Sequence, residues 1–193
     1  MSLITDTSLY NDETINRFMK LLMKRNEDRI FAFDTFFIPE INRRELDTIN
    51  TRFKENLLLK TTALAPIHIN NNHWIIAVDD IQQHEIICYD SLDCHDIKEI
   101  TKFRQFMIRH ELRMSGSKSM WPIFRGETTI QENNYDCGPW ILEIAVPWSQ
   151  RRPKKLVCIK CVSTWLKAEP RNRSRPEKLV CSKCSNEMLS PWD

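Results

Sequence analysis

A single thiol stands in the polar stretch QENNYDCGPW, which spans residues 131–140. A free cysteine is a modest nucleophile at neutral pH, because its pKa of about 8.5 keeps it mostly protonated. A helix N-terminus and a neighbouring imidazole both favour the thiolate. Pro139 indicates a helix that begins at or just after Cys137, with Asp136 as its candidate cap. These residue types favour nucleophilic catalysis by Cys137, and a small buried core side chain is the alternative.

A cysteine nucleophile needs a base and a group that orients the base. Of the five histidines, His73 begins the apolar run HWIIAV, where a rigid strand can aim its ring. His68 is the nearest rival, since a strand could present that ring equally well. Asp90, in YDSL at the end of the next strand candidate, can orient the imidazole if the two strands form a hairpin. The alternative for Asp90 is a turn cap, a common use of aspartate.

Acyl transfer also produces an oxyanion, which needs hydrogen-bond donors already in place. Gln131 lies six residues before Cys137 and can supply a side-chain N–H to a hole shared with the backbone N–H of Cys137. Loss of one such donor typically lowers turnover about 100- to 1000-fold. We therefore expect substitution of Gln131 to lower turnover measurably.

The elements that must position these side chains alternate between helix and strand. Asn11 and the acids after it cap a stretch with apolar residues at helical spacing, and aromatic or β-branched runs mark the strands. The patterns predict helices over 11–25, 43–55, 96–114 and 138–146, the last stopped by Pro147. They predict strands over 30–38, 65–69, 73–81 and 85–92, of which the last two form a hairpin. This alternation indicates an α+β layer structure with a mixed sheet.

Charge divides the chain into two parts. Residues 149–193 hold 11 of the 28 Lys and Arg and 4 of the 26 Asp and Glu, which gives +7, and residues 1–148 carry 17 minus 22, or −5. This asymmetry predicts a main domain over 1–148 and a basic tail over 149–193. No apolar run approaches the roughly 18 residues that a membrane helix needs, so we expect an intracellular protein with no membrane partner.

The tail contains two near-repeats, KKLVCIKC and EKLVCSKC. Each holds a C-x-x-C pair, and 19 residues separate the pairs, a pattern typical of tetrahedral four-cysteine zinc sites. The predicted ligands are Cys158, Cys161, Cys181 and Cys184. Because so short a segment hardly folds unaided, we expect structural zinc to stabilise it. The alternative is a basic tail with unliganded thiols, and in either form its charge suits nucleic acid or an acidic surface.

Several motifs occur in an order that resembles the ubiquitin-like-protein-specific cysteine proteases, also called sentrin or SUMO proteases. The resemblance covers about residues 9–146. Its motifs are Asn11-Asp12, Thr35-Phe36-Phe37, Pro66-Ile67 ahead of Asn72, His73-Trp74, Asp90-Ser91, Gln131, Asn134 and Asp136-Cys137-Gly138.

This resemblance implies a papain-like cysteine protease fold and cleavage after the C-terminal Gly-Gly of SUMO or a related modifier. It implies that Cys137 attacks, His73 is the base, Asp90 orients it and Gln131 stabilises the oxyanion, with no cofactor for catalysis. Trp74 would form one side of a channel so narrow that only two glycines fit in it. The alternative for Trp74 is simple core packing.

The resemblance also implies that Leu9, Asp12 and Asn134 contact the substrate. Leu9 stands where the family usually has a tryptophan. One alternative is therefore an inactive modifier-binding or zinc-mediated scaffold, and another is an acyltransferase that uses the same thioester. The resemblance and the basic tail imply a nuclear or nucleo-cytoplasmic protein.

Overall fold

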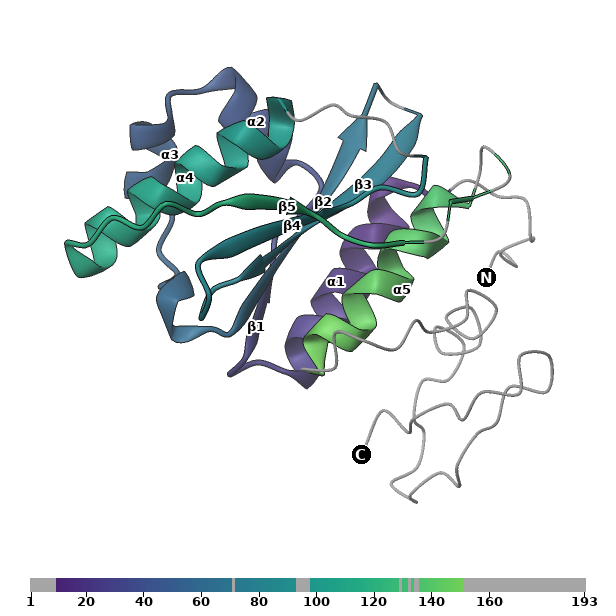
Figure 1. Ribbon diagram of the computed structural model, residues 1–193, viewed down its shortest axis with the longest axis horizontal. Coiled ribbons are helices and arrows are strands. Elements are labelled where there is room, and N and C mark those ends of the chain that lie inside the picture. Colours follow the sequence, from purple (N-terminus) through teal and green to yellow (C-terminus); the bar gives the residue numbers. More distant parts are fainter. Residues whose placement is uncertain are drawn as a thin grey trace, which may run out of the picture.

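The computed structural model describes residues 10–70, 72–92, 98–128, 130, 131, 133 and 136–150. Helices cover both faces of a mixed five-stranded sheet, so the fold is α+β as expected (Figure 1). The strands, which lie in chain order across the sheet, are β1 (Ile30–Ala32), β2 (Thr62–Ile69), β3 (His73–Asp80), β4 (Glu85–Tyr89) and β5 (Ile123–Arg125). The helices are α1 (Asp12–Arg25), α2 (Phe37–Arg43), α3 (Leu46–Arg52), α4 (Lys98–Ser115) and α5 (Cys137–Ser149), with a short 3-10 helix η1 (Leu57–Leu59).

The middle of the sheet is a three-stranded antiparallel unit. β3 pairs with β2 on one side and with β4 on the other, and the parallel strands β1 and β5 form the two edges. All residues of β3 except the last are buried, as its apolar sequence predicts. No helix within the described ranges has the length and apolar character needed to cross a membrane.

One face of the sheet carries α1 and α5 (Figure 1). Helix α1 begins as its sequence predicts, because the Asn11 side chain accepts a hydrogen bond from the Thr14 backbone N–H, at 3.0 Å. Its buried residues pack with α5 and with the side chains of β3 that point to this face.

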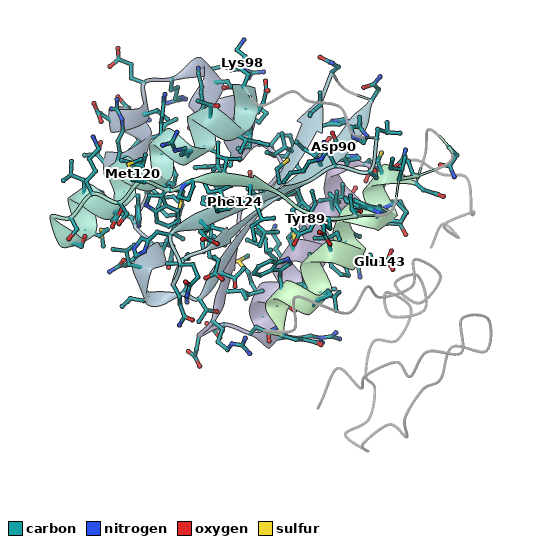
Figure 2. The ribbon with its side chains drawn as sticks, viewed as in Figure 1. Tyr89, Asp90, Lys98, Met120, Phe124 and Glu143 are labelled. Atoms are coloured by element: carbon teal, nitrogen blue, oxygen red, sulfur yellow. The ribbon has the colours of Figure 1, made fainter. Side chains whose placement is uncertain are left out.

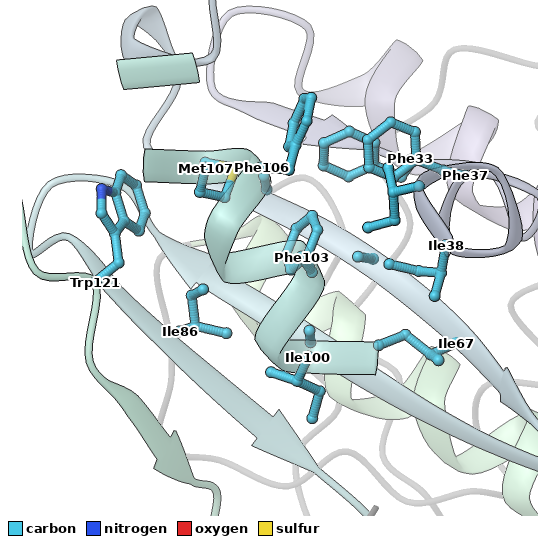
Figure 3. Close-up of a cluster of buried hydrophobic side chains, with 14 of the residues drawn as sticks. Phe33, Phe37, Ile38, Ile67, Ile86, Ile100, Phe103, Phe106, Met107 and Trp121 are labelled. Carbon is cyan, nitrogen blue, oxygen red and sulfur yellow. The ribbon is translucent and has the colours of Figure 1, made fainter. Parts of the chain in front are cut away.

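The opposite face carries α2, α3 and α4 over an aromatic cluster (Figure 3). Phe33 stacks on Phe37 with ring centroids 4.2 Å apart, and Phe106 meets Phe37 edge-on at 4.9 Å. Such pairs add to the free energy of burial. This face is a packed aliphatic and aromatic core.

Two segments differ from the sequence prediction near the N-terminal half. The strand predicted over 30–38 ends at Ala32, and α2 begins at Phe37. The helix predicted over 43–55 covers only Leu46–Arg52, because Arg43 ends α2 and residues 53–56 are not helical. The aromatic run suggested a strand, but these rings are placed by tertiary packing in the aromatic cluster rather than by alternation along a strand.

The last described helix also corrects a prediction. Helix α5 does not stop before Pro147 but continues through it to Ser149. Pro147 cannot donate a backbone hydrogen bond to Glu143, a loss that normally costs about 3 kcal/mol in a helix interior. Burial of the whole last turn offsets this cost, since Val146, Trp148 and Ser149 are all buried. The short edge strand β5 was not predicted, because three residues give no periodic signal.

Candidate active site

His73 and Asp90 are brought together by two consecutive hairpins. A tight turn precedes His73, in which Asn70 has a φ of +50° and Asn72 N–H donates to the Ile69 carbonyl at 3.1 Å. Asparagine tolerates this left-handed conformation, so the turn is short and β3 starts directly at His73.

The pairing of β3 with β4 then sets the position of Asp90. Ile76 lies opposite Tyr89, so the same register continued by one step places Asp90 opposite Ile75. His73 lies two residues farther along the same face, within diagonal reach. The outcome is a hydrogen bond of 2.8 Å between His73 Nε2 and Asp90 Oδ1. Asp90 follows Tyr89 at the end of β4 (Figure 2).

The Asp90 carboxylate is held by its own turn. Its Oδ1 also accepts a hydrogen bond from the Leu92 backbone N–H, at 2.8 Å. The two alternatives weighed for Asp90 are therefore combined in the structure, since the same oxygen closes a turn and contacts the imidazole. This contact occupies Nε2 of His73, so Nδ1 is the nitrogen that can exchange a proton with the Cys137 thiol.

Cys137 is the first residue of α5, the position that Pro139 indicated. Asp136 occupies the N-cap position, but its side chain makes no capping hydrogen bond, contrary to the expectation. Its carboxylate instead accepts from Asn133 Nδ2, at 2.7 Å. Cys137 is 2% exposed, so its thiol is buried at the positive end of a thirteen-residue helix.

The electrostatics of the site favour an ion pair between His73 and Cys137. Burial lowers the pKa of His73, but its hydrogen bond to Asp90 and its interactions with the Asp90 carboxylate and the Cys137 sulfur outweigh burial and raise that pKa to about 9. Burial raises the pKa of the Cys137 thiol, but its interactions with the His73 ring and the Trp74 backbone N–H outweigh burial. The charge of His73 and the Gly138 N–H add to this effect, and the pKa of the thiol falls below its ordinary value. Both shifts favour the charged forms, imidazolium at His73 and thiolate at Cys137.

Gln131 is fixed beside the site by Ser91. Its backbone N–H donates to the Ser91 carbonyl at 2.9 Å, and its Oε1 accepts from the Ser91 hydroxyl at 2.6 Å. One N–H of the side-chain amide donates to the Asn133 carbonyl. A primary amide has two N–H donors, and within the described residues the second has no recorded acceptor. Ser91, which is completely buried, is a positioning residue whose contribution sequence reasoning did not assign.

Trp74, the residue after His73, is part of the hydrophobic core. It is 3% exposed, and its Nε1 donates to the Tyr10 carbonyl at 2.9 Å. Tyr10 also packs against Gly138, where an added Cβ would lie 2.4 Å from the Tyr10 Cβ. Only glycine fits at position 138, and Tyr10 links the strand that carries His73 to the helix that carries Cys137. Tyr10 was not singled out from the sequence, because a lone aromatic before a helix gives no signal.

His68, the rival base, lies on the neighbouring strand. It is opposite Trp74 in the register of β2 and β3, and the two rings stack with centroids 4.0 Å apart. Asp12 lies close enough to His68 for its charge to raise the pKa of that ring, although burial, the larger influence, lowers it. The interactions that shift the pKa of Cys137 include His73 but not His68.

The other predicted site residues lie outside the described part of the chain. These are Leu9, Asn134 and the four tail cysteines, Cys158, Cys161, Cys181 and Cys184. Within the described ranges, no group of three or more His, Cys, Asp or Glu side chains could hold a metal ion.

Comparisons with known proteins agree with this architecture. The model of the Ulp1 protease family, C-terminal catalytic domain, matches residues 8–161. A sentrin-specific protease of Caenorhabditis elegans is 28% identical over 153 residues, which are 74% of this chain and 22% of that protein. Human sentrin-specific protease 3 is 25% identical over 137 residues, and this chain spans about a quarter of its length.

Solved structures share the fold. The structure of SUMO protease Ulp1 with its catalytic cysteine oxidised to a sulfinic acid has a TM-score of 0.72 at 20% identity. The match covers 83% of this chain and 75% of that one.

Proposed function

This chain belongs to the Ulp1 protease family, and we propose that it is a cysteine protease that cleaves after the C-terminal Gly-Gly of SUMO or a related modifier. The observation that carries this proposal is the arrangement of His73, which contacts Asp90 through Nε2 and interacts with a thiol of lowered pKa. Relatives and structural neighbours named as SUMO proteases support the choice of substrate.

The reaction follows from the ion pair. The Cys137 thiolate attacks the carbonyl carbon of the last glycine, and the tetrahedral intermediate collapses as the bond to the amine breaks. The His73 imidazolium gives its proton to the leaving amine, whether that amine is a lysine side chain or a precursor tail. Water then attacks the thioester while His73 accepts its proton, which releases the modifier carboxylate and the thiolate. Asp90 holds the ring in place through both steps.

The negative oxygen formed in each step needs donors. The second N–H of the Gln131 amide and the backbone N–H of Cys137, at the first turn of α5, are the donors we assign. The Ser91 hydroxyl holds the amide oxygen, so the N–H side is presented consistently. This arrangement stabilises the intermediate without reorganisation of the side chain.

We place the substrate along the wall that surrounds His73. Trp74 and Leu9 border the channel for the two glycines, and Asn134 precedes Cys137 in the polar stretch at the start of α5. The body of the modifier lies against Asp12 and Phe36, since Phe36 is a large apolar side chain that is 61% exposed. Exposed aromatic residues of this kind are common anchors in protein interfaces.

A modifier with an electrophile at its C-terminal glycine tests this function. SUMO carrying a vinyl sulfone should form a covalent adduct with the wild-type chain, detected by mass spectrometry, and none with Cys137→Ala. If the modifier binds but neither adduct nor hydrolysis occurs, the chain is a binding scaffold. If an adduct forms, and if with an uncleaved SUMO precursor as substrate the acyl group passes from Cys137 to an added amine or hydroxyl acceptor faster than to water, the chain is an acyltransferase.

For the tail we propose structural zinc held by Cys158, Cys161, Cys181 and Cys184, with a domain boundary near residue 149. The spacing of the two C-x-x-C pairs supports the zinc site. Metal analysis of the purified chain should find about one zinc per molecule, lost in the Cys181→Ser, Cys184→Ser double variant, and full zinc content in that variant would exclude the site. Contact of the basic tail with nucleic acid or an acidic surface, and a nuclear location, are part of the same proposal.

A further inference from the structure

A groove of about 490 Å³ borders the active site on the side of His68. It runs from the start of α1 to α2 and is lined by Asp12, Thr35, Phe36, Pro39, Glu40, Arg43, Arg44 and His68. His68 stacks on Trp74, the residue after His73, so one end of the groove is continuous with the wall of the site. A macromolecule whose C-terminus enters the site can therefore place its body over this groove.

The backbone that carries the exposed ring of Phe36 is held by hydrogen bonds. The residue before it, Thr35, is clamped by Asn16 through two hydrogen bonds, Asn16 Nδ2 to Thr35 Oγ1 at 3.0 Å and Thr35 N–H to Asn16 Oδ1 at 2.9 Å. The Phe36 backbone N–H donates to Asp34 Oδ1, at 3.0 Å. Because this backbone is already fixed, it loses little conformational entropy when Phe36 binds a partner.

The charges around Phe36 are not equivalent. Arg44 and Glu40 form an ion pair at 3.5 Å and largely cancel each other. Arg43, at the last position of α2, is exposed and has no ion-pair partner within the described part of the chain. Asp12 lies at the other end of the groove, next to His68. The groove is therefore polarised, with negative charge towards the active site and positive charge at the end of α2.

We infer that Arg43 is a specificity-determining residue, which selects modifiers that carry a carboxylate beside the apolar patch that covers Phe36. The inference rests on the proposed function, since it concerns the body of the modifier whose C-terminus reaches Cys137. A modifier with a basic side chain at that point would meet Arg43 as a like charge, which opposes docking.

Arg52 provides a matched control. α2 and α3 are both seven-residue helices that end in an exposed arginine, Arg43 and Arg52, but only Arg43 lines the groove. Any effect of charge reversal on the dipole of a short helix is therefore common to Arg43→Glu and Arg52→Glu. Only the former removes the cation from the groove.

The experiment compares two probes on the full chain: SUMO vinyl sulfone and a short Gly-Gly peptide vinyl sulfone, which reaches the thiol but not the groove. Arg43→Glu should lower the rate constant for SUMO labelling about tenfold or more and leave peptide labelling unchanged, whereas Arg52→Glu should change neither. A SUMO variant with one surface carboxylate changed to lysine should restore labelling of Arg43→Glu.

Two results would overturn the inference: equal SUMO labelling of wild type and Arg43→Glu, or an equal loss in Arg52→Glu. Failure of the proposed function looks different, because wild type would then be labelled by neither probe. In that event the same comparison is made as SUMO affinity in the Cys137→Ala background, where an affinity unchanged by Arg43→Glu overturns the inference and a tenfold weakening supports it.

Discussion

Two histidine–carboxylate pairs lie at opposite ends of the hairpin formed by β3 and β4. His73 and Asp90 lie where β3 begins and β4 ends, while His84, in the turn between these strands, contacts Glu111 of α4 at 3.5 Å. Glu111 also accepts hydrogen bonds from the Ser119 N–H, the Ser119 hydroxyl and Trp121 Nε1, at 2.7–2.9 Å.

The two pairs differ in whether their polar atoms all have hydrogen-bond partners. Burial raises the pKa of Glu111, but its hydrogen bonds to Ser119 and Trp121 outweigh burial and lower it, so the carboxylate is stable and saturated. At the other pair, Nδ1 of His73 is buried and makes no conventional hydrogen bond among the described residues, although Cys137 acts on its pKa. A saturated pair holds loops together, whereas a pair with one open position and an adjacent thiol can move a proton.

The largest test of this contrast is Asp90→Asn. The amide preserves the shape of the side chain but removes the charge that supports the His73 imidazolium, so kcat/KM for modifier release should fall about 100- to 10,000-fold. The pKa of His73, about 9 in the wild type, should move towards 6.5. The alkaline limb of the pH–rate profile should shift to lower pH with it. If that limb does not shift, Asp90 does not control the pKa of His73.

The same raised pKa has a consequence for stability. A histidine whose pKa is higher in the folded state stabilises the fold fully below 6.5, and this contribution is lost as the pH rises through about 9. Asp90→Asn should therefore reduce the free energy of unfolding at pH 6 more than at pH 10, as measured by urea denaturation.

The next effect is at the saturated pair. Glu111→Ala leaves Trp121 and Ser119 without their acceptor in a buried site, which should lower the free energy of unfolding by about 2–4 kcal/mol. Because the pKa of Glu111 is lowered on folding, its contribution is present above 4.5 and is lost as the pH falls through the folded value. Activity per folded molecule should stay within about twofold of wild type, and a larger loss would connect this cluster to the active site.

A third buried carboxylate has neither a histidine partner nor hydrogen-bond donors among the described residues. Asp79, on β3, is 0% exposed, and neither of its oxygens makes a hydrogen bond within the described structure. Burial raises its pKa well above the ordinary value. Such a group reduces stability as the pH rises above 3.8, where the unfolded chain ionises and the folded chain does not.

Asp79→Val is therefore expected to stabilise the protein, by about 1–2 kcal/mol at pH 8 and less at pH 4. Thermal and urea unfolding at the two pH values measure the gain. Asp80→Val, at the neighbouring position with a half-buried side chain, is the control, and it should give no comparable gain. Equal free energies of unfolding for wild type and Asp79→Val at pH 8 would mean that another group in the folded protein offsets the cost of burying the Asp79 carboxyl.

Sequence reasoning located the elements of the site better than the elements around them. The hairpin of β3 and β4 and the start of α5 follow from local signals, namely apolar runs, short polar turns and a proline in a first turn. The role expected of Gln131 stays a prediction, and Ser91, which holds its amide oxygen, has no local signature. Pro147 and the aromatic run before α2 misled the prediction because long-range burial decides both conformations.

The smallest effect is expected at His84, whose ring is the weakest part of the saturated pair. The side chain is 39% exposed, and its contact with Glu111 is long, at 3.5 Å. Its backbone has a φ of +54°, so the substitution must tolerate the left-handed region, and asparagine does so better than alanine.

His84→Asn should therefore lower the free energy of unfolding by less than about 1 kcal/mol, because the His84 side chain is partly exposed and its contact with Glu111 is long. Part of this loss comes from the edge-on contact with Trp121, whose ring centroid lies 5.2 Å from that of His84. The double variant His84→Asn, Glu111→Ala measures the coupling directly. A coupling free energy above about 1 kcal/mol would contradict this expectation, because it would show that the long contact with His84 contributes strongly to the stability that Glu111 supplies.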